Sequence, residues 1–264
     1  MIGVGIITCN RPDFYNVCVN SINTDWYDEL VTINDGEDIV VSKGEYIKTE
    51  GGIGVGKAKN KAMQHLLDKG CKYIILVEDD MKFKDNLFKA YIEAYKKTGI
   101  HHFMFAYHGP ANKGNISGGN PTPRKIIDYG DIKISLNQHC VGAVTFYTRE
   151  SLEDVGLNDE EFNKNNFEHV EHSYRLAKGG YSTPYWWWAD LANSLNYVEE
   201  QACSEVSSSI RRGDDWHDKI RWSAELFQKK HGYMPAWNNA VPDTPLSEII
   251  SVLKTYEKNK STRS

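Results

Sequence analysis

The sequence has few cysteines and no long apolar run, and both absences narrow the class of protein. Its five cysteines are scattered through 264 residues and are never closer than nine positions. They therefore predict neither a disulfide framework nor a CxxC metal site, and we expect a cytoplasmic protein. No run approaches the ~18 apolar residues of a membrane-spanning helix. The opening "MIGVGIITCNRP" has no basic leader and no small-residue cleavage site, so we expect no signal peptide.

The chain also lacks an excess of positive charge. Lys and Arg total 31 against 36 Asp and Glu, which gives a formal charge of -5. This balance argues against a broad basic surface for nucleic acid, although a local basic groove stays open. We find no internal repeat and no low-complexity stretch, and the length is ample for a core. We predict one domain over 1–210, with a helical extension over 211–264 packed on it.

Short apolar runs alternate with helical patterns in the first half, which predicts an α/β fold with a mostly parallel sheet. The expected strands are Ile2–Thr8, 30–33, 39–41, 46–49 and 73–77. Helices are expected in "NRPDFYNVCVNSI", after the glycine loop "GGIGVGKA", and in "DNLFKAYIEAYKKTG". The second half predicts strands at 102–107, 125–135 and 141–147 around a Gly/Asn/Pro-rich loop at 108–124, and helices near 168–178, 215–231 and 245–258.

Three consecutive acids, Glu78, Asp79 and Asp80, follow the apolar run "KYIILV". In an extended chain, Glu78 and Asp80 point to one side and Asp79 to the other. Open α/β sheets bind ligands beyond the carboxyl ends of their strands, where these acids are expected. Carboxylates there suit Mg²⁺ or Mn²⁺ with a phosphate. The alternative is a solvated strand end that caps the next helix.

Two other motifs are incomplete. "GGIGVGKA" nearly matches the phosphate loop GxxxxGK[ST], but Ala58 stands where a hydroxyl should meet Mg²⁺. The loop is then either an anion-binding turn at a helix N-terminus or a tight turn alone. "HVEH" at 169–172 contains the H-x-E of zinc deaminases, yet no PCxxC follows, and it is not HExxH. We exclude both zinc enzymes.

Together, five ordered segments resemble the GT-A glycosyltransferases, most closely the family 2 type, over about 2–185. "VGIITCNRPDF" resembles the opening strand and turn, which implies that Thr8, Asn10 and Arg11 contact the nucleotide sugar. "TINDG" resembles the second strand end, which implies that Asp35 binds the uracil ring. "GIGVGKAKNKA" resembles the glycine-then-Asn helix start, with Asn60 at the Asn position. "LVEDDM" resembles the DxD-type motif, and "CVGAVTFYTRESLEDVGLNDEEF" resembles the acceptor-side segment.

The resemblance implies a Rossmann-like GT-A fold, with a nucleotide-sugar half at about 1–100 and an acceptor half at about 101–210. It implies transfer of a hexose from a UDP-sugar to an acceptor hydroxyl, with Mn²⁺ or Mg²⁺ held by Asp80 and by Glu78 or Asp79. Lys57 would add positive charge, as would Arg11, although an exposed Lys is commonly just solvated. By position only, His217 is the candidate for the late His that ligates metal in other GT-A enzymes; the alternative is a surface His.

One departure from the family concerns the general base. Members usually carry Glu-Asp after the acceptor segment, with Asp as the base of inverting enzymes, whereas this chain has Glu168-His169. His169 is a competent base near neutral pH, and Glu168 or Glu171 are alternatives. The choice between inversion and retention therefore stays open. Helical spacing also places Glu168, Glu171, His172 and Arg175 on one side, as a structural salt-bridge face would.

The acceptor also stays open. In "YWWWAD", from residue 185, a strand would put Trp186 and Trp188 on one face and Trp187 on the other, as core or as a sugar-stacking platform. Some phage members of the class glycosylate hydroxymethylated DNA bases, and Arg211, Arg212 and the tail "KNKSTRS" would suit that acceptor. The His at the base position keeps a third hypothesis, a non-catalytic sugar-nucleotide or glycan-binding protein. The oligomeric state is not predicted.

Overall fold

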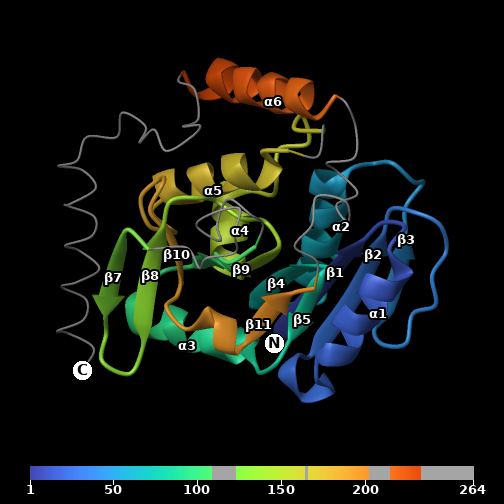
Figure 1. Cartoon of the computed structure of the whole chain (residues 1–264), viewed down its shortest axis with the longest axis horizontal. Helices are drawn as coiled ribbons and strands as arrows, with labels where there is room; N and C mark the ends of the chain where they lie inside the picture. The colour runs from blue at the N-terminus through green and yellow to red at the C-terminus, as the bar shows by residue number, and fades with distance from the viewer. Residues whose placement is uncertain (109–122, 164–165, 202–214, 233–264) are drawn as a thin grey trace.

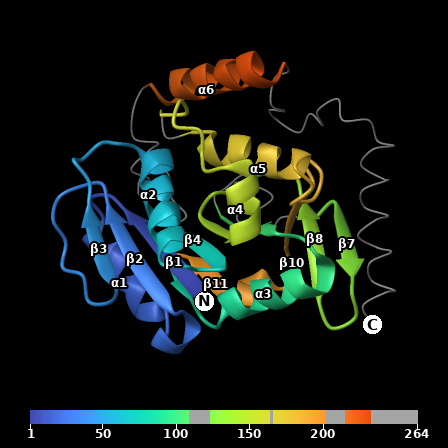
Figure 2. The same cartoon turned by 180° about the vertical axis from the view of Figure 1, so that it is seen from behind.

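The computed structural model describes residues 1–108, 123–163, 166–201 and 215–232 (Figures 1 and 2). A six-stranded sheet with the order β3-β2-β1-β4-β9-β6 forms its centre. Strands β1 to β4 are parallel, and β9 runs antiparallel to both β4 and β6. This confirms the predicted mostly parallel α/β sheet. The strands are β1 (Ile2–Thr8), β2 (Glu29–Asn34), β3 (Glu45–Lys48), β4 (Tyr73–Glu78), β6 (His102–Met104) and β9 (Val144–Thr148).

Helices cover both faces of this sheet, because successive side chains of its buried strands alternate between two cores. In β4, Ile75 and Val77 belong to one core and Ile74 and Leu76 to the other. The first core includes α1 (Pro12–Ser21) and α3 (Leu87–Thr98), and the second includes α2 (Val55–Asp68), α4 (Arg149–Val155) and one residue of α5 (Glu168–Lys178). Helix α2 lies close to β1, since a Cβ on Gly5 would come within 2.8 Å of Ala62 Cβ.

Two smaller sheets complete the described part. The strands β7 (Lys125–Asp128), β8 (Lys133–Asn137) and β10 (Trp188–Leu191) form an antiparallel sheet in the order β10-β8-β7. The strands β5 (Met81–Phe83) and β11 (Val198–Glu200) pair antiparallel just beyond the end of β4. Short 3-10 turns lie at Thr24–Trp26 and Ser194–Asn196.

Helix α6 (Trp216–His231) lies over α5 in both views (Figures 1 and 2). Its C-terminal turn is tied down by Lys230 Nζ, 2.7 Å from an Asp159 carboxylate oxygen, and by His231 Nε2, 3.2 Å from Glu171 Oε1. The predicted helix near 215–231 is therefore confirmed. The predicted helix at 245–258, together with Arg211 and Arg212, lies outside the described residues, and the division at residue 210 stays a prediction.

Two predicted strands differ from the structure. The strand at 39–41 is wrong: these residues join no strand, and Val40 is 85% exposed, so a β-favouring run without a partner strand stays a loop. The single strand at 125–135 is the β7-β8 hairpin, in which Gly130 turns the chain with φ 91°. Within the described ranges, no helix combines the length and apolar character that spanning a membrane requires.

Candidate functional site

The three acids lie at the carboxyl end of β4, as predicted, but they are not a solvated strand end. Glu78 is the last residue of β4, and Asp79 and Asp80 form the turn into β5. Asp79 is fully buried and Asp80 is 7% exposed. The Gln201 amide holds this turn by donating to the carbonyls of Asp79 at 3.0 Å and Met81 at 3.1 Å. Buried carboxylates require partners, and the structure supplies three cationic or titratable side chains.

Arg11 is the first of these partners, and it lies across two of the acids. Its guanidinium forms a close ion pair with Asp79 and places Nη1 3.1 Å from Asp80 Oδ2. Thr8 Oγ1 also donates to Asp79 at 2.7 Å. Burial raises the pKa of Asp79 to about 7, because Arg11 and Thr8 offset only part of the desolvation. The structure thus brings the predicted Thr8 and Arg11 to the acid turn.

His108 is the second partner, and with Glu78 and Asp80 it forms a candidate metal site. The ligand atoms of these three residues all lie within 4.8 Å of one another. Asp80 Oδ1 and His108 Nε2 are buried, are 3.6 Å apart and have no hydrogen-bond partner. Two buried ligand atoms without hydrogen bonds, facing one another with a further carboxylate beside them, fit a divalent cation; the two carboxylates suit Mg²⁺ or Mn²⁺, and the imidazole extends the set to other transition metals.

Without a cation, the electrostatics around His108 describe an ion pair in which the imidazole carries a proton that a bound cation would replace. Burial alone would raise the pKa of Asp80, but His108 and Arg11 lower it to about 2. Glu200, in β11, places Oε1 3.4 Å from His108 Nε2. The predicted third ligand, His217, is instead exposed in the first turn of α6 and is not part of this three-residue group. Sequence reasoning did not single out His108.

Lys59 is the third partner, and it connects the acid turn to the candidate base. Its ammonium lies 2.9 Å from Glu78 Oε1, 3.3 Å from Glu168 Oε1 and 3.1 Å from the Gly142 carbonyl. Its side chain is only 3% exposed. Burial alone would lower the pKa of Lys59, but the Glu78 and Glu168 carboxylates outweigh that effect and hold the pKa above its ordinary value. The predicted Lys57 is 43% exposed and lies 3.9 Å from Glu160.

Helix α5 begins with Glu168 and His169, the two neighbouring candidates for the general base. Glu168 is buried, and its Oε1 lies 3.1 Å from His169 Nδ1. Burial raises the pKa of Glu168, but Lys59 and His169 lower it well below the ordinary range. Glu168 is therefore ionised, while the His169 side chain remains 23% exposed. A Cβ on Gly142 would lie 3.0 Å from the His169 ring, so the closeness of the segment before β9 to the imidazole depends on glycine.

Glu171, the other candidate base, has a structural environment. Arg175 Nε donates to Glu171 Oε1 at 2.7 Å, and the same guanidinium donates to the carbonyls of Val155 and Leu157 at 2.6 Å. Glu171 also lies 3.2 Å from His231 of α6. The salt-bridge reading of this helix side thus describes Glu171 and Arg175, whereas Glu168 belongs with Lys59.

The glycine loop before α2 turns its N–H groups toward a carboxylate of the same chain. Asp35, at the end of β2, accepts from Ile53 N and Gly54 N at 3.0 Å each and from Thr49 Oγ1. An anion therefore does lie at this helix start, but it is the Asp35 side chain. Ala58 is fully buried, which agrees with the missing hydroxyl of a phosphate loop. Uracil recognition by Asp35 stays a prediction.

Asn10 and Asn60 make contacts within the protein. Asn10 adopts φ 56° and its Oδ1 accepts from Glu37 N at 2.8 Å, which joins the turns after β1 and β2. Asn60 exchanges hydrogen bonds of 2.9 Å with the backbone of Asn158 and so ties α2 to the segment before α5. Nucleotide-sugar contacts by either residue stay predictions.

The tryptophan run is mostly core. Trp186 and Trp188 are both buried, with their ring centroids 6.4 Å apart. Trp186 has φ 66°, which is not an extended conformation, and the strand begins only at Trp188. Trp187 is partly exposed and packs one side against the main core. The Arg124 guanidinium lies over its ring, 5.3 Å from the centroid. That cation occupies the position that a stacked sugar would take.

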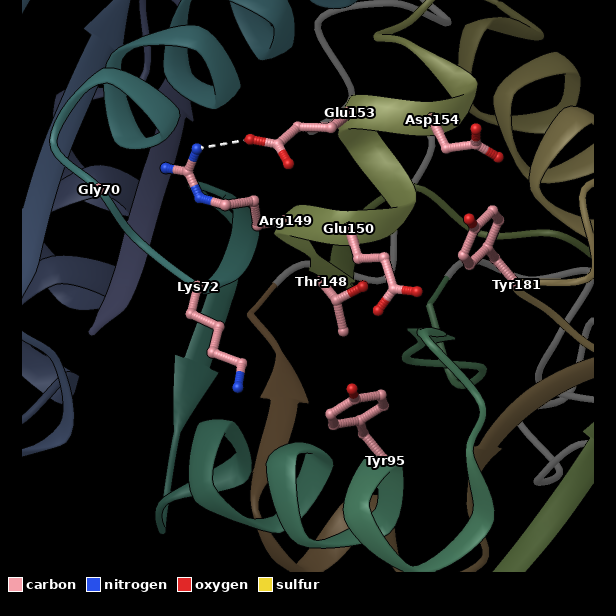
Figure 3. Close-up of a pocket in the computed structure, with 9 residues that line it drawn as sticks. All are labelled: Gly70, Lys72, Tyr95, Thr148, Arg149, Glu150, Glu153, Asp154 and Tyr181. Atoms are coloured by element: carbon pink, nitrogen blue, oxygen red, sulfur yellow. Dashed lines mark hydrogen bonds and ion pairs between the residues drawn. The ribbon is translucent and has the colours of Figure 1, made fainter.

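A separate pocket of about 660 Å³ lies at the other end of β4 (Figure 3). Tyr95 and Tyr181 border it, and the Arg149–Glu153 ion pair of 2.8 Å lies at its side. None of the acid-turn residues lines it. Because ligands of open α/β sheets bind beyond the carboxyl ends of strands, the acid turn is the stronger candidate for a functional site.

The chain has the GT-A fold, that of nucleotide-sugar glycosyltransferases: a structural match covers the whole chain and 72% of S. aureus TarS 1-349, with a TM-score of 0.54 and 14% identity. The same residues cover 44% of a longer TarS chain.

A mannosyltransferase, PcManGT from Pyrobaculum calidifontis in complex with GDP-Man and Mn²⁺, matches 99% of this chain and 73% of its own, with a TM-score of 0.54 and 13% identity. TarS 1-349 in complex with UDP-GlcNAc matches with a TM-score of 0.55. No protein-family model matches the sequence, and no curated protein matches it.

Proposed function

We propose that the protein is a metal-dependent glycosyltransferase that moves a sugar from a nucleoside diphosphate sugar to an acceptor hydroxyl. The observation that carries this proposal is the convergence of Glu78, Asp80 and His108 at the carboxyl end of β4, where buried Asp80 Oδ1 and His108 Nε2 have no hydrogen-bond partner. On a GT-A fold, that corner is where a diphosphate would meet a divalent cation. A cation held there would neutralise the charge of the leaving diphosphate.

The donor we propose is a UDP-hexose. Asp35 comes directly after β2, and its N–H donates to Thr8 at the end of β1. This position agrees with the proposed contact of Asp35 with the uracil ring. The TarS structures in complex with UDP-GlcNAc and with UDP support a uridine donor, while PcManGT with GDP-Man and Mn²⁺ supports a metal-bound donor on this fold. Arg11, which bridges Asp79 and Asp80, would exchange part of that pairing for the donor's phosphate oxygens.

His169 is the base in this proposal, and Glu168 positions it. Because Glu168 is ionised and lies 3.1 Å from Nδ1, it favours the tautomer that carries the proton on Nδ1. Nε2 is then the free acceptor for the proton of the attacking hydroxyl. Lys59 keeps Glu168 charged and also contacts Glu78. One ammonium therefore stabilises both the Glu168–His169 pair and a carboxylate of the proposed metal site.

The experiment that tests the proposal measures calorimetric binding of UDP with and without Mn²⁺, and release of UDP from UDP-sugars. We expect Mn²⁺-dependent binding and slow donor hydrolysis. Asp80→Asn should remove the metal dependence and leave the protein folded, while Asp68→Asn, a matched exposed acid of α2, should change neither. Binding without any turnover would favour the non-catalytic alternative, and no binding of any nucleotide would refute the proposal.

A further inference from the structure

Arg124 differs from Arg11, Lys59 and Arg175, the buried or half-buried cations described above, because no acid neutralises it in the described part of the chain. It is half-buried, and its Nε is buried without a hydrogen-bond partner. No carboxylate forms an ion pair with it within the described ranges, whereas Arg11, Lys59 and Arg175 each contact one or two. An arginine held partly out of water without a counter-ion normally indicates a missing anionic partner.

The guanidinium is held in place. Arg124 N donates to the Leu136 carbonyl at 2.8 Å, which fixes the backbone at the start of β7. The planar head lies over the Trp187 ring, and that ring packs against the main core. Stacking on an anchored indole leaves the two Nη groups, rather than the buried Nε, to bind an oxyanion in two-point geometry.

Its position is on the side of the candidate base. The start of β7, the end of β8 and the start of β10 form one edge of the small sheet, since Lys125 pairs with Leu136 and Trp188 with Asn137. From Asn137 the chain reaches Gly142, which contacts the His169 ring, in five residues, a span of about 18 Å at most.

The connecting segment makes further contacts with both ends. His139 lies close enough to Arg124 for the guanidinium to lower its pKa, second to the effect of burial. Cys140 Sγ lies 3.8 Å from the His169 carbonyl. A chain of two or three sugar units would extend from one end of this segment to the other.

We propose that Arg124 recognises an acidic substituent, a carboxylate or a phosphate, on a glycan acceptor whose reacting hydroxyl lies at His169. This inference rests on the proposed function and adds the class of acceptor. The guanidinium without a counter-ion, its support by Trp187 and the short segment that links its surroundings to the base all point to a negatively charged glycan. The net charge of -5 and the absence of a second free cation in the contacts described at this edge favour such a glycan over duplex DNA.

The test is a glycan array that carries neutral oligosaccharides, the matched oligosaccharides with a uronic acid, and the matched phosphate esters, probed with the labelled full-length protein. We expect binding to the acidic members over the neutral ones. Arg124→Gln should weaken binding to acidic members by roughly 10- to 100-fold, the scale of a hydrogen bond to a charged group, with neutral members unchanged. Arg124→Lys should retain part of the binding, because it keeps the charge and loses the planar fork.

Lys133→Gln is the matched control, because it removes one positive charge from the opposite edge of the same sheet and should leave the array pattern unchanged. Equal binding of neutral and acidic glycans, no binding to acidic glycans, no effect of Arg124→Gln in a folded protein, or preferential binding of duplex DNA would each overturn the inference. The array contains no donor. Failure of UDP binding would refute the proposed function, whereas array failure with intact UDP binding would refute only the acceptor class.

Discussion

Lys59 allows a quantitative test of how this site is held together. Lys59→Met keeps a similar shape and removes the ammonium that lies between Glu78 and Glu168. Glu168 is 3% exposed as a side chain and would keep His169 and a backbone hydrogen bond but no full positive charge in the place of Lys59. Removing one partner of a buried ion pair costs about 3–5 kcal/mol, because the remaining charge stays buried without compensation. We therefore expect the free energy of unfolding to fall by about that amount.

The assay is urea unfolding at pH 7, followed by circular dichroism, for the wild type and four variants. Lys57→Met is the control, because Lys57 lies on the same helix but is 43% exposed and 3.9 Å from its acid; we expect a change within about 0.5 kcal/mol. Glu168→Gln alone should cost less than Lys59→Met, since Lys59 keeps Glu78. The double variant Lys59→Met/Glu168→Gln should be more stable than Lys59→Met alone, because the fully buried Glu168 charge is then removed and only Glu78, whose side chain is 21% exposed, loses its partner.

The reasoning is refuted if Lys59→Met is no more destabilising than Lys57→Met, or if the double variant shows the sum of the two single losses. Either result would mean that the ammonium and the Glu168 carboxylate do not stabilise one another in the folded protein. A changed urea dependence (m-value) would separate an effect on the unfolded state from an effect on this pair.

Three further predictions follow from described contacts. Burial lowers the pKa of His102 from 6.5 to about 4, so between these pH values the unfolded chain binds a proton that the folded protein does not. The free energy of unfolding should therefore fall by roughly 3 kcal/mol from pH 6.5 to pH 4. In a pH series of urea unfolding, His102→Gln should flatten that part of the curve. Gly142→Ala should lower donor turnover without changing UDP affinity in calorimetry, because its Cβ would press within 3.0 Å of Lys59 Nζ and the His169 ring; unchanged turnover would contradict this. Asp35→Asn should speed amide hydrogen exchange in the glycine loop, since each carboxylate oxygen accepts from one loop amide and the Asn side chain keeps only one acceptor; unaltered exchange would show that the loop does not depend on Asp35.

The sheet was predictable from the sequence where strands are buried on both faces. Ile2–Thr8 matches β1, and 73–77 lies within β4, because a continuous apolar run bounded by turn residues is typical of a central parallel strand. The run at 39–41 looks similar but has no neighbouring strand, and β-propensity without a partner does not form a strand. Pairing is a property of the tertiary structure, which local composition does not determine.

The acids of the site were predictable, but most of their partners were not. Glu78 and Asp80 follow a strand, and that local pattern sufficed. His108 is 28 residues further along the chain and has no motif around it, so only the fold brings it to Asp80. Lys59 did leave a signal: with Ala62, Met63 and Leu66 it shares the buried side of α2. A lysine within an apolar helical stripe predicts a buried ion pair, and that signal outweighs the motif position of Lys57.

Gln201 gives the order in which this corner is completed. Its side chain donates to carbonyls on both sides of the acid turn, and its backbone N–H donates to the Asp80 carbonyl at 2.7 Å. These contacts span 120 residues or more, and a chain emerging from the ribosome carries the acids long before it carries the glutamine. During synthesis the acid turn therefore waits for a segment 120 residues further along the chain, and a nascent fragment that stops short of Gln201 has the carboxylates without the hydrogen bonds that fix their turn.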